Sequence, residues 1–198
     1  MRLALVGGTF DPFHRGHLEP VLAVREEMAW DRIIYIPAFR QPFKTGAATS
    51  SSYDRHAMAV LGTSEHDDVD VSQIELQRGA ISYTVDTLEE LHSLHPKAEL
   101  DWIIGDDNLA QLPQWKESER LFDLARFVVL TRGGATVPAE LQERAGARHI
   151  VFARNQTVPI SATDIRNRVR RGESIDAFVE LSVSRYIQHN RLYREANT

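Results

Sequence analysis

The feature that most constrains this chain lies near its start, where an apolar run over residues 3–6 leads into a glycine-rich stretch over 7–17 and then into a helical pattern. This order of strand, turn and helix start is how α/β proteins present a phosphate site. The first turn of a helix offers an anion unpaired N–H groups and the positive end of the helix dipole. Gly7 and Gly8 have no Cβ, so we expect the backbone to turn sharply there and to lie close to a ligand.

His14 and His17 flank Gly16 within this stretch. We expect both imidazoles to converge on one phosphoryl group and to donate hydrogen bonds as charge builds on its oxygens, so that the protein need supply no nucleophile. From these residues alone, the glycines could also form an ordinary tight turn, and the histidines a metal site or exposed surface. A structural zinc site is disfavoured, because it needs four ligands and the chain contains no cysteine.

Length and composition set the broad class. The 198 residues are enough for one buried core and contain no long linker, so we expect a single domain over residues 1–198. The formal net charge of -5 argues against a nucleic-acid partner. The absence of cysteine excludes disulfides and thiolate catalysis, as is usual in a reducing cytoplasm. With no signal stretch and no apolar run of about 18 residues, we expect a cytoplasmic protein without membrane contact.

Apolar runs of strand length alternate with segments of helical periodicity. Such alternation predicts the α/β class, with a doubly wound, Rossmann-like parallel sheet flanked by helices. A small helical region from about residue 160 to 198 completes the chain, and its last helix, over 183–193, suggests only packing. The expected strands cover 3–6, 33–36, 69–72, 100–104, 126–131 and 149–152. The expected helices between them cover 18–28, 53–61, 117–125 and 138–145, and a further helix opens within 81–88 and continues to Leu94.

Candidate ligand residues follow several of these strands. The irregular loop over 38–52 carries Lys44, for which a phosphate contact and an exposed position are equally acceptable from the local sequence. Ser52 is the expected cap of the next helix. Gly105 and Asp107 follow the fourth strand, where a carboxylate serves a ribose hydroxyl or a metal, or only the turn.

A further helix start follows residue 81, with Ser82 or Thr84 as its expected cap and leucines up to Leu94 on its buried face. It would expose another set of N–H groups. Trp115 lies in an irregular stretch with a proline. Such an aromatic side chain is either a stacking platform for a ligand or, more commonly, cover for the core.

A second phosphate element lies near the end of the chain. Ser161 and Asp164 have the spacing of a capping box, and the helix that they begin carries Arg166. A helix start, a hydroxyl and a guanidinium together suit a polyphosphate. One helix cannot direct four arginines at one ligand, so we expect the other three to be exposed and balanced by acids; they are Arg168, Arg170 and Arg171.

These motifs carry a resemblance. The stretch over 7–17 matches the GGTFDPxHxGH form of the HxGH signature of the nucleotidylyltransferase superfamily, and residues 160–166 resemble its second signature. The segments 82–88 and 105–107, together with Trp115, are similar to what distinguishes the bacterial nicotinate-nucleotide adenylyltransferases. The resemblance covers nearly the whole chain.

The resemblance implies an activity: ATP and nicotinate mononucleotide would give deamido-NAD and pyrophosphate, with Mg²⁺ bound through the phosphates and not by protein side chains. It implies that His14 and His17 contact the reacting phosphates. A homo-oligomer is compatible with the sequence, which does not specify the oligomeric state. The resemblance also implies that Lys44, Ser161 and Arg166 hold the polyphosphate, that Asp107 meets a ribose and that Trp115 stacks on the nicotinate ring. The other implied substrate-binding residues are Gly7, Gly8, Thr9, Phe10, Ser82, Tyr83, Thr84, Gly105, Ile160 and Thr163.

The chain departs from the family where members usually have Pro-Pro-His-Lys, because it has Gln41-Pro42-Phe43-Lys44. A phosphate contact from position 43 is therefore in doubt. A preference for nicotinate over nicotinamide is expected to come from backbone dipoles near Thr84, because residues 80–88 contain no lysine or arginine. The alternatives are another adenylyltransferase, such as the phosphopantetheine enzyme, and a nucleotide-binding module without turnover.

Overall fold

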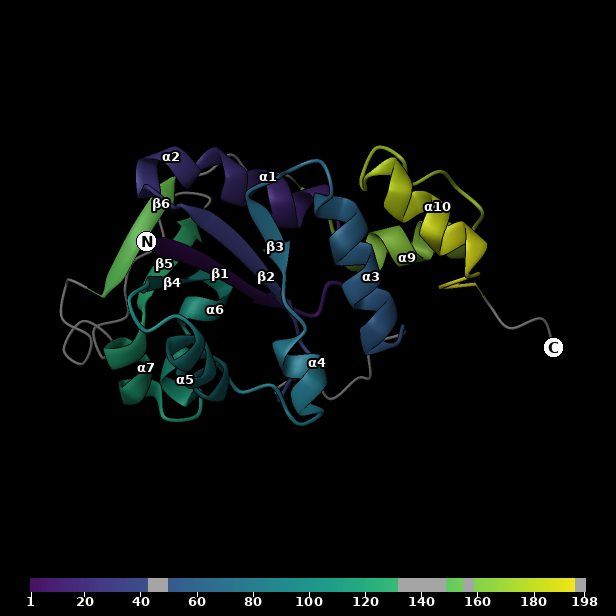
Figure 1. Ribbon diagram of the computed structural model, residues 1–198. Helices are drawn as coiled ribbons and strands as arrows, with labels where there is room; N and C mark the ends of the chain where they lie inside the picture. The colour runs from purple at the N-terminus through teal and green to yellow at the C-terminus, as the bar shows by residue number, and fades with distance from the viewer. Residues whose placement is uncertain (43–49, 132–148, 155–158, 195–198) are drawn as a thin grey trace.

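The computed structural model describes residues 1–42, 50–131, 149–154 and 159–194. Six strands form one sheet in the order β3-β2-β1-β4-β5-β6, and all neighbouring strands are parallel (Figure 1). The predicted doubly wound, Rossmann-like parallel sheet is confirmed. The strands are β1 (Arg2–Gly8), β2 (Arg32–Pro37), β3 (Val69–Val71), β4 (Glu99–Gly105), β5 (Arg126–Thr131) and β6 (Ile150–Arg154).

Helices cover both faces of the sheet, and Figure 1 shows α5 and α7 together, away from the group formed by α3, α9 and α10. No helix in the described ranges is long and apolar enough to cross a bilayer. The helices are α1 (Arg15–Ala23), α2 (Arg25–Met28), α3 (Ser52–Thr63), α4 (Ile74–Arg78), α5 (Thr84–Leu94), α6 (Asp106–Leu109), the 3-10 turn η1 (Leu112–Gln114), α7 (Ser118–Leu124), α9 (Ala162–Arg170) and α10 (Leu181–His189).

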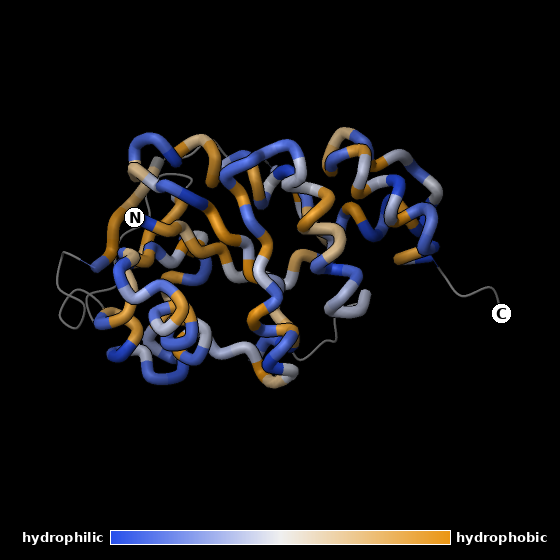
Figure 2. The backbone as a smooth tube through the Cα atoms, viewed as in Figure 1, coloured by the Kyte–Doolittle hydropathy of each residue, from blue (hydrophilic) through white to orange (hydrophobic). Residues whose placement is uncertain are grey.

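The core divides into two clusters because side chains alternate along each strand. In β1, Ala4 and Val6 join the cluster that α1, α3, α9 and α10 cover, whereas Leu3 and Leu5 join the cluster beneath α5 and α7. A parallel strand that is buried on both faces needs apolar residues at successive positions. Figure 2 shows these apolar residues running through the central strands.

Three predictions about helices are wrong in detail. The helix expected over 18–28 is interrupted at Val24, whose φ of -106° and ψ of 1° separate α1 from α2. Ser51, not Ser52, caps α3, because its Oγ accepts the N–H of Asp54 at 3.1 Å. Leu94 is 63% exposed, since α5 ends at this residue.

The predicted caps of two other helices also differ. Tyr83 occupies the N-cap position of α5, and the Ser82 hydroxyl instead accepts the N–H of Phe39 at 3.0 Å. Ser161 is the N-cap residue of α9 but makes no side-chain cap hydrogen bond, so the expected capping box with Asp164 is not formed. The last helix ends at His189 and not at residue 193. Lys44 and the helix expected over 138–145 lie outside the described residues.

Candidate active site

The candidate site lies at the carboxyl ends of β1 and β4. These adjacent strands lead to opposite faces of the sheet, since β1 continues into α1 and β4 continues towards α7. In open α/β sheets, ligands bind in the crevice at such a switch point. The stretch over 7–17 therefore stands where the fold favours a ligand.

Gly7 and Gly8 do not form the sharp turn that we expected. Both lie at the end of β1, and neither has a positive φ. A Cβ on Gly7 would lie 2.6 Å from Cζ2 of Trp102, and one on Gly8 would lie 2.6 Å from Cε1 of Phe10. Glycine is needed here because two aromatic rings pack directly against the strand.

His14 and His17 lie against one another at the start of α1. Their ring centroids are 3.6 Å apart, with 22° between the ring planes. The main-chain N–H of His14 donates to Nδ1 of His17 at 3.2 Å, which places the proton of a neutral His17 on Nε2. A Cβ on Gly16 would lie 3.1 Å from the ring of His14, so glycine at this position makes room for the imidazole.

An aromatic wall holds His17 in place. The rings of Phe10 and Phe13 lie with their centroids 5.0 Å and 5.6 Å from that of His17. The hydroxyl of Tyr35 in β2 donates to the carbonyl of His17 at 2.9 Å. Packing against the two phenyl rings and the main-chain N–H of His14 on Nδ1 therefore orient the imidazole, and Tyr35 fixes the main chain of His17, as a preorganised donor requires.

Burial lowers the pKa of His14 to about 4. The residue is only 6% exposed, and its Nδ1 has no hydrogen-bond partner within the part of the chain that the structure describes. A buried polar atom without a partner costs free energy, and at a ligand site a bound polar group can satisfy it. At neutral pH the His14 imidazole is therefore uncharged.

This low pKa predicts a stability loss in acid. An unfolded His14 takes up its proton near pH 6.5, whereas the folded residue does so only near 4, so its contribution is complete above pH 6.5 and is lost as the pH falls towards 4. Between pH 7 and pH 5 we expect His14 to lower the free energy of unfolding by about 2 kcal/mol. Urea unfolding at both pH values measures this loss.

Two variants isolate the histidine responsible. His14→Gln should lose this part of the pH dependence, whereas His189→Gln, at the exposed end of α10, should retain it. The same pH dependence in His14→Gln and in the unaltered chain would contradict the assignment.

The two signatures of the sequence meet at this site. Arg166 on α9 donates from Nη1 to the carbonyl of Asp11 at 2.7 Å and from Nη2 to Oγ1 of Thr163 at 3.1 Å. A Cβ on Gly16 would lie 3.4 Å from Cβ of Ile160, so the start of α1 also faces the segment before α9. Ser161 and Thr163 are both exposed.

The hydrogen-bond network around Asp11 was not predicted from the sequence. The hydroxyl of Tyr193 donates to Oδ1 of Asp11 at 2.6 Å, and the hydroxyl of Ser50 donates to the same oxygen. Tyr193 belongs to the segment for which the sequence suggested only packing. The position of Tyr193 in the sequence does not predict its contact with Asp11. The location of Asp11 inside the signature could have prompted a search for its hydrogen-bond partner.

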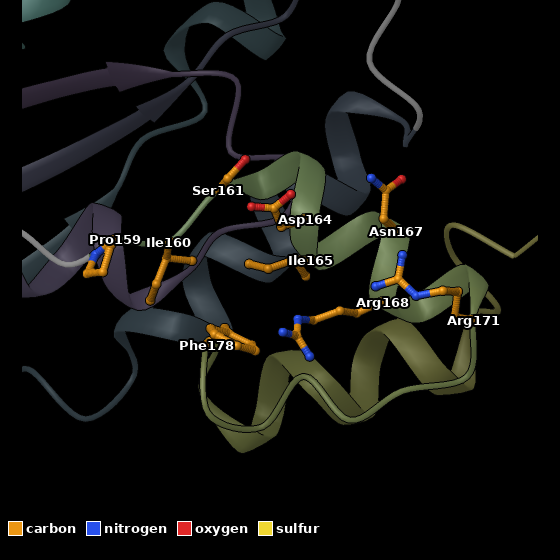
Figure 3. Close-up of a pocket in the computed structure, with 9 residues that line it drawn as sticks. All are labelled: Pro159, Ile160, Ser161, Asp164, Ile165, Asn167, Arg168, Arg171 and Phe178. Atoms are coloured by element: carbon orange, nitrogen blue, oxygen red, sulfur yellow. The ribbon is translucent and has the colours of Figure 1, made fainter.

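A cavity of about 260 Å³ lies along α9, between this helix and Phe178 (Figure 3). Ser161 lies at one end of it, and Arg168 and Arg171 lie at the other. Both arginines pair with Glu173, at 3.3 Å and 2.6 Å. These two are balanced by an acid, as predicted, and Arg170, which is exposed, bonds to Asn167.

A second group of predicted residues gathers at the start of α5. Nζ of Lys116 lies 5.0 Å from the ring centroid of Tyr83 and 2.7 Å from Oδ1 of Asp86 in the first helical turn. A lysine distant in sequence thus reaches this helix start, where its ammonium pairs with a carboxylate. That backbone dipoles set the preference for nicotinate stays a prediction. Trp115 is half-buried, and its ring packs edge-on against Phe127 with a centroid distance of 6.4 Å.

Asp107 follows β4 in the first turn of α6 and is exposed. A Cβ on Gly105 would lie 2.5 Å from Oδ1 of Asp107, so glycine allows the carboxylate to fold back over the strand end. The side-chain amide of Asn108 donates to the same oxygen at 3.0 Å. The carboxylate is thus presented at the switch point.

Comparisons with known proteins now define the class. The sequence model described as cytidylyltransferase-like matches residues 5–168 of this chain. A protein of Streptomyces coelicolor named "Probable nicotinate-nucleotide adenylyltransferase" is 39% identical over 96% of this chain and 99% of its own length. A protein of the same name from Desulfitobacterium hafniense is 37% identical over 98% of this chain and 96% of its own. The chain belongs to the nicotinate-nucleotide adenylyltransferase family, within the cytidylyltransferase-like class.

A solved structure shares the fold. Nicotinic acid mononucleotide adenylyltransferase of Plasmodium falciparum, complexed with NaAD, superposes with a TM-score of 0.77. The alignment covers 97% of both chains at 17% sequence identity. At that identity the likeness shows the fold alone.

Proposed function

We propose that this chain transfers the adenylyl group of ATP to nicotinate mononucleotide, giving deamido-NAD and pyrophosphate. The observation that carries the proposal is the pair of stacked imidazoles of His14 and His17 at the start of α1, with Arg166 bound to the same loop. Membership of the nicotinate-nucleotide adenylyltransferase family supports the choice of substrates.

In this proposal the 5′-phosphate of the mononucleotide attacks the α-phosphorus of ATP in line, and pyrophosphate leaves. His17 donates from Nε2 to an oxygen on which charge develops, and the neutral imidazole of His14 supplies a second hydrogen bond. Ser161 and Arg166 hold the polyphosphate, and Lys44 is proposed to join them. The protein positions the reactants and stabilises charge, and forms no covalent bond to them.

The other predicted residues serve substrate binding in the same proposal. Asp107 accepts a hydrogen bond from a ribose hydroxyl, and Trp115 stacks on the nicotinate ring. The remaining contacts come from the main chain and side chains that line the strand ends and helix starts; they are Gly7, Gly8, Thr9, Phe10, Ser82, Tyr83, Thr84, Gly105, Ile160 and Thr163.

A divalent metal accompanies nucleotidyl transfer of this kind, and we propose Mg²⁺. Mg²⁺ keeps several waters and binds largely through phosphate oxygens, so it requires no protein cage. Within the described ranges, no group of three or more histidine, aspartate or glutamate side chains could hold a metal ion. When bound, the ion would neutralise part of the charge on the polyphosphate. We also propose that residues 1–198 act as one domain in the cytoplasm.

One assay distinguishes the proposed activity from the two alternative functions. Pyrophosphate release is measured with ATP and Mg²⁺ in the presence of nicotinate mononucleotide, nicotinamide mononucleotide or 4′-phosphopantetheine. We expect turnover with nicotinate mononucleotide. Turnover with phosphopantetheine alone would identify a different adenylyltransferase, and ATP binding without turnover would identify a nucleotide-binding module.

We predict that kcat/KM for nicotinate mononucleotide exceeds that for the nicotinamide form by about 5- to 150-fold. The N–H groups at the start of α5 are donors, which a carboxylate accepts with both oxygens, and the ammonium of Lys116, which pairs with Asp86, lies beside them. A carboxamide turns its own N–H donors towards them, and such a mismatch costs about 1–3 kcal/mol. Equal values of kcat/KM under one condition, or a preference for the amide, would overturn the substrate assignment.

A further inference from the structure

Arg55 is a buried guanidinium for which the proposed mechanism has no use. It lies in the first half of α3, is 2% exposed, and makes hydrogen bonds to main-chain carbonyls of two different loops. Nη1 donates to the carbonyl of Thr9 at 2.7 Å, and Nη2 donates to the carbonyl of Phe39 at 3.2 Å. One side chain thus joins the loop after β1 to the loop after β2.

Carboxylates near Arg55 favour its charged form. Burial lowers the pKa of the guanidinium, and the charges of Asp11 and Glu75 oppose that effect. Each of these groups has a hydrogen bond of its own, Asp11 with Tyr193 at 2.6 Å and Glu75 with Thr87 at 2.7 Å. The two hydrogen bonds of Arg55 described above therefore serve the backbone of the loops.

The bond to Thr9 controls the peptide that follows it. In a planar trans peptide the C=O and the next N–H point in opposite directions, so holding the carbonyl of Thr9 also fixes the N–H of Phe10. Phe10 has a φ of 55°, a left-handed conformation that a bulky residue adopts only when its surroundings impose it. Its ring packs against His17. Arg55 therefore supports the main chain at Thr9 and Phe10, whose phenyl ring packs against His17.

The bond to Phe39 extends the same control to a third segment. The N–H of Phe39 donates to Oγ of Ser82 at 3.0 Å, and the N–H of Ser82 donates to the carbonyl of Arg40 at 2.8 Å. The loop after β2 is thus bonded to the segment that leads into α5. Arg55 thus bonds directly to the loops that follow β1 and β2. It is linked to the segment before α5 through Phe39, which bonds to Ser82.

We propose that Arg55 is a positioning residue for adenylyl transfer, which fixes the main chain of the loops after β1 and β2 through the carbonyls of Thr9 and Phe39. The inference rests on the proposed function. Arginine suits this role because its planar fork places two donors in fixed directions, whereas the ammonium of a lysine is a single point.

The test compares Arg55→Lys and Arg55→Met with Thr63→Val. Thr63 is buried at the other end of α3, where its hydroxyl donates to the carbonyl of Ala59 at 2.9 Å, so it serves as a control for damage to the helix itself. We expect kcat to fall roughly 10- to 100-fold in both Arg55 variants, with a smaller change in KM, because displaced groups lose transition-state contacts first. Thr63→Val should keep its kcat.

Amide hydrogen exchange separates this role from general destabilisation and from failure of the proposed function. In folded Arg55→Lys, exchange should accelerate at residues 9–10 and 39–40 and stay unchanged in β4 and β5. This readout holds even if the unaltered chain has no adenylyl transfer activity, and it decides the inference through the lysine variant if Arg55→Met does not fold. An unchanged kcat in folded Arg55→Lys, or faster exchange throughout the sheet, would overturn it.

Discussion

Replacing His17 with alanine is expected to lower kcat for adenylyl transfer about a hundredfold while the KM for ATP changes little. The imidazole packs against Phe10 and Phe13, the main chain of His17 is held by the Tyr35 hydroxyl, and Nδ1 accepts a main-chain N–H, so Nε2 is a preorganised donor. The loss of one such donor to a developing charge typically costs on the order of 3 kcal/mol in the transition state. Steady-state kinetics with ATP and nicotinate mononucleotide measures it.

The companion variants make this result specific. His14→Ala should show a similar loss of kcat, because its ring is stacked on His17. His17→Gln keeps a donor near the position of Nε2 and should recover part of the rate. His92→Ala is the matched control, since Nε2 of this histidine contacts the carbonyl of Leu124, which precedes the amino end of β5 and not the carboxyl ends where the site lies. Unchanged kcat in both His14→Ala and His17→Ala would remove the histidines from the mechanism.

The parts of the fold that sequence could predict are those set by local pattern. Most strands carry an apolar run bounded by clear breaks, and the short edge strand β3, in which Asp70 is exposed, was predicted from its alternation of apolar and polar residues. The pairing of His14 with His17 was also predictable, because residues three apart at a helix start lie close together. Only the family resemblance assigned the signatures over 7–17 and 160–166 to one site. Nothing in either segment specifies the hydrogen bond from Arg166 to Asp11.

Contacts between segments that are distant in the sequence could not be predicted. The need for glycine at position 7 comes from the ring of Trp102 in a neighbouring strand, not from a turn. Lys116 reaches the start of α5 from beyond β4, so a search of residues 80–88 for a cation could not find it. Arg55 has the spacing of an ordinary helical residue, and only the fold reveals that its guanidinium meets two loops.

Replacing Asp101 with alanine is expected to cause the largest loss of stability among these variants. Asp101 lies near the amino end of β4, 1% exposed, opposite Arg126 of β5 in the parallel register. It accepts hydrogen bonds from Nε of Arg126 at 2.9 Å and from Nε1 of buried Trp30 at 2.6 Å. Alanine would leave both donors without this acceptor.

The expected loss is about 3–5 kcal/mol, because breaking a buried pair leaves uncompensated polar groups, and in a chain of this size that lowers Tm by roughly 10 °C. Glu99→Ala is the matched control, since Glu99 in the same strand pairs with Arg2 at the exposed surface, where water and salt weaken the attraction. Its Tm should hardly change. Both variants should keep kcat, because these pairs lie at the amino ends of the strands and the site lies at the carboxyl ends. A Tm for Asp101→Ala close to that of Glu99→Ala would show that burial adds nothing to this pair.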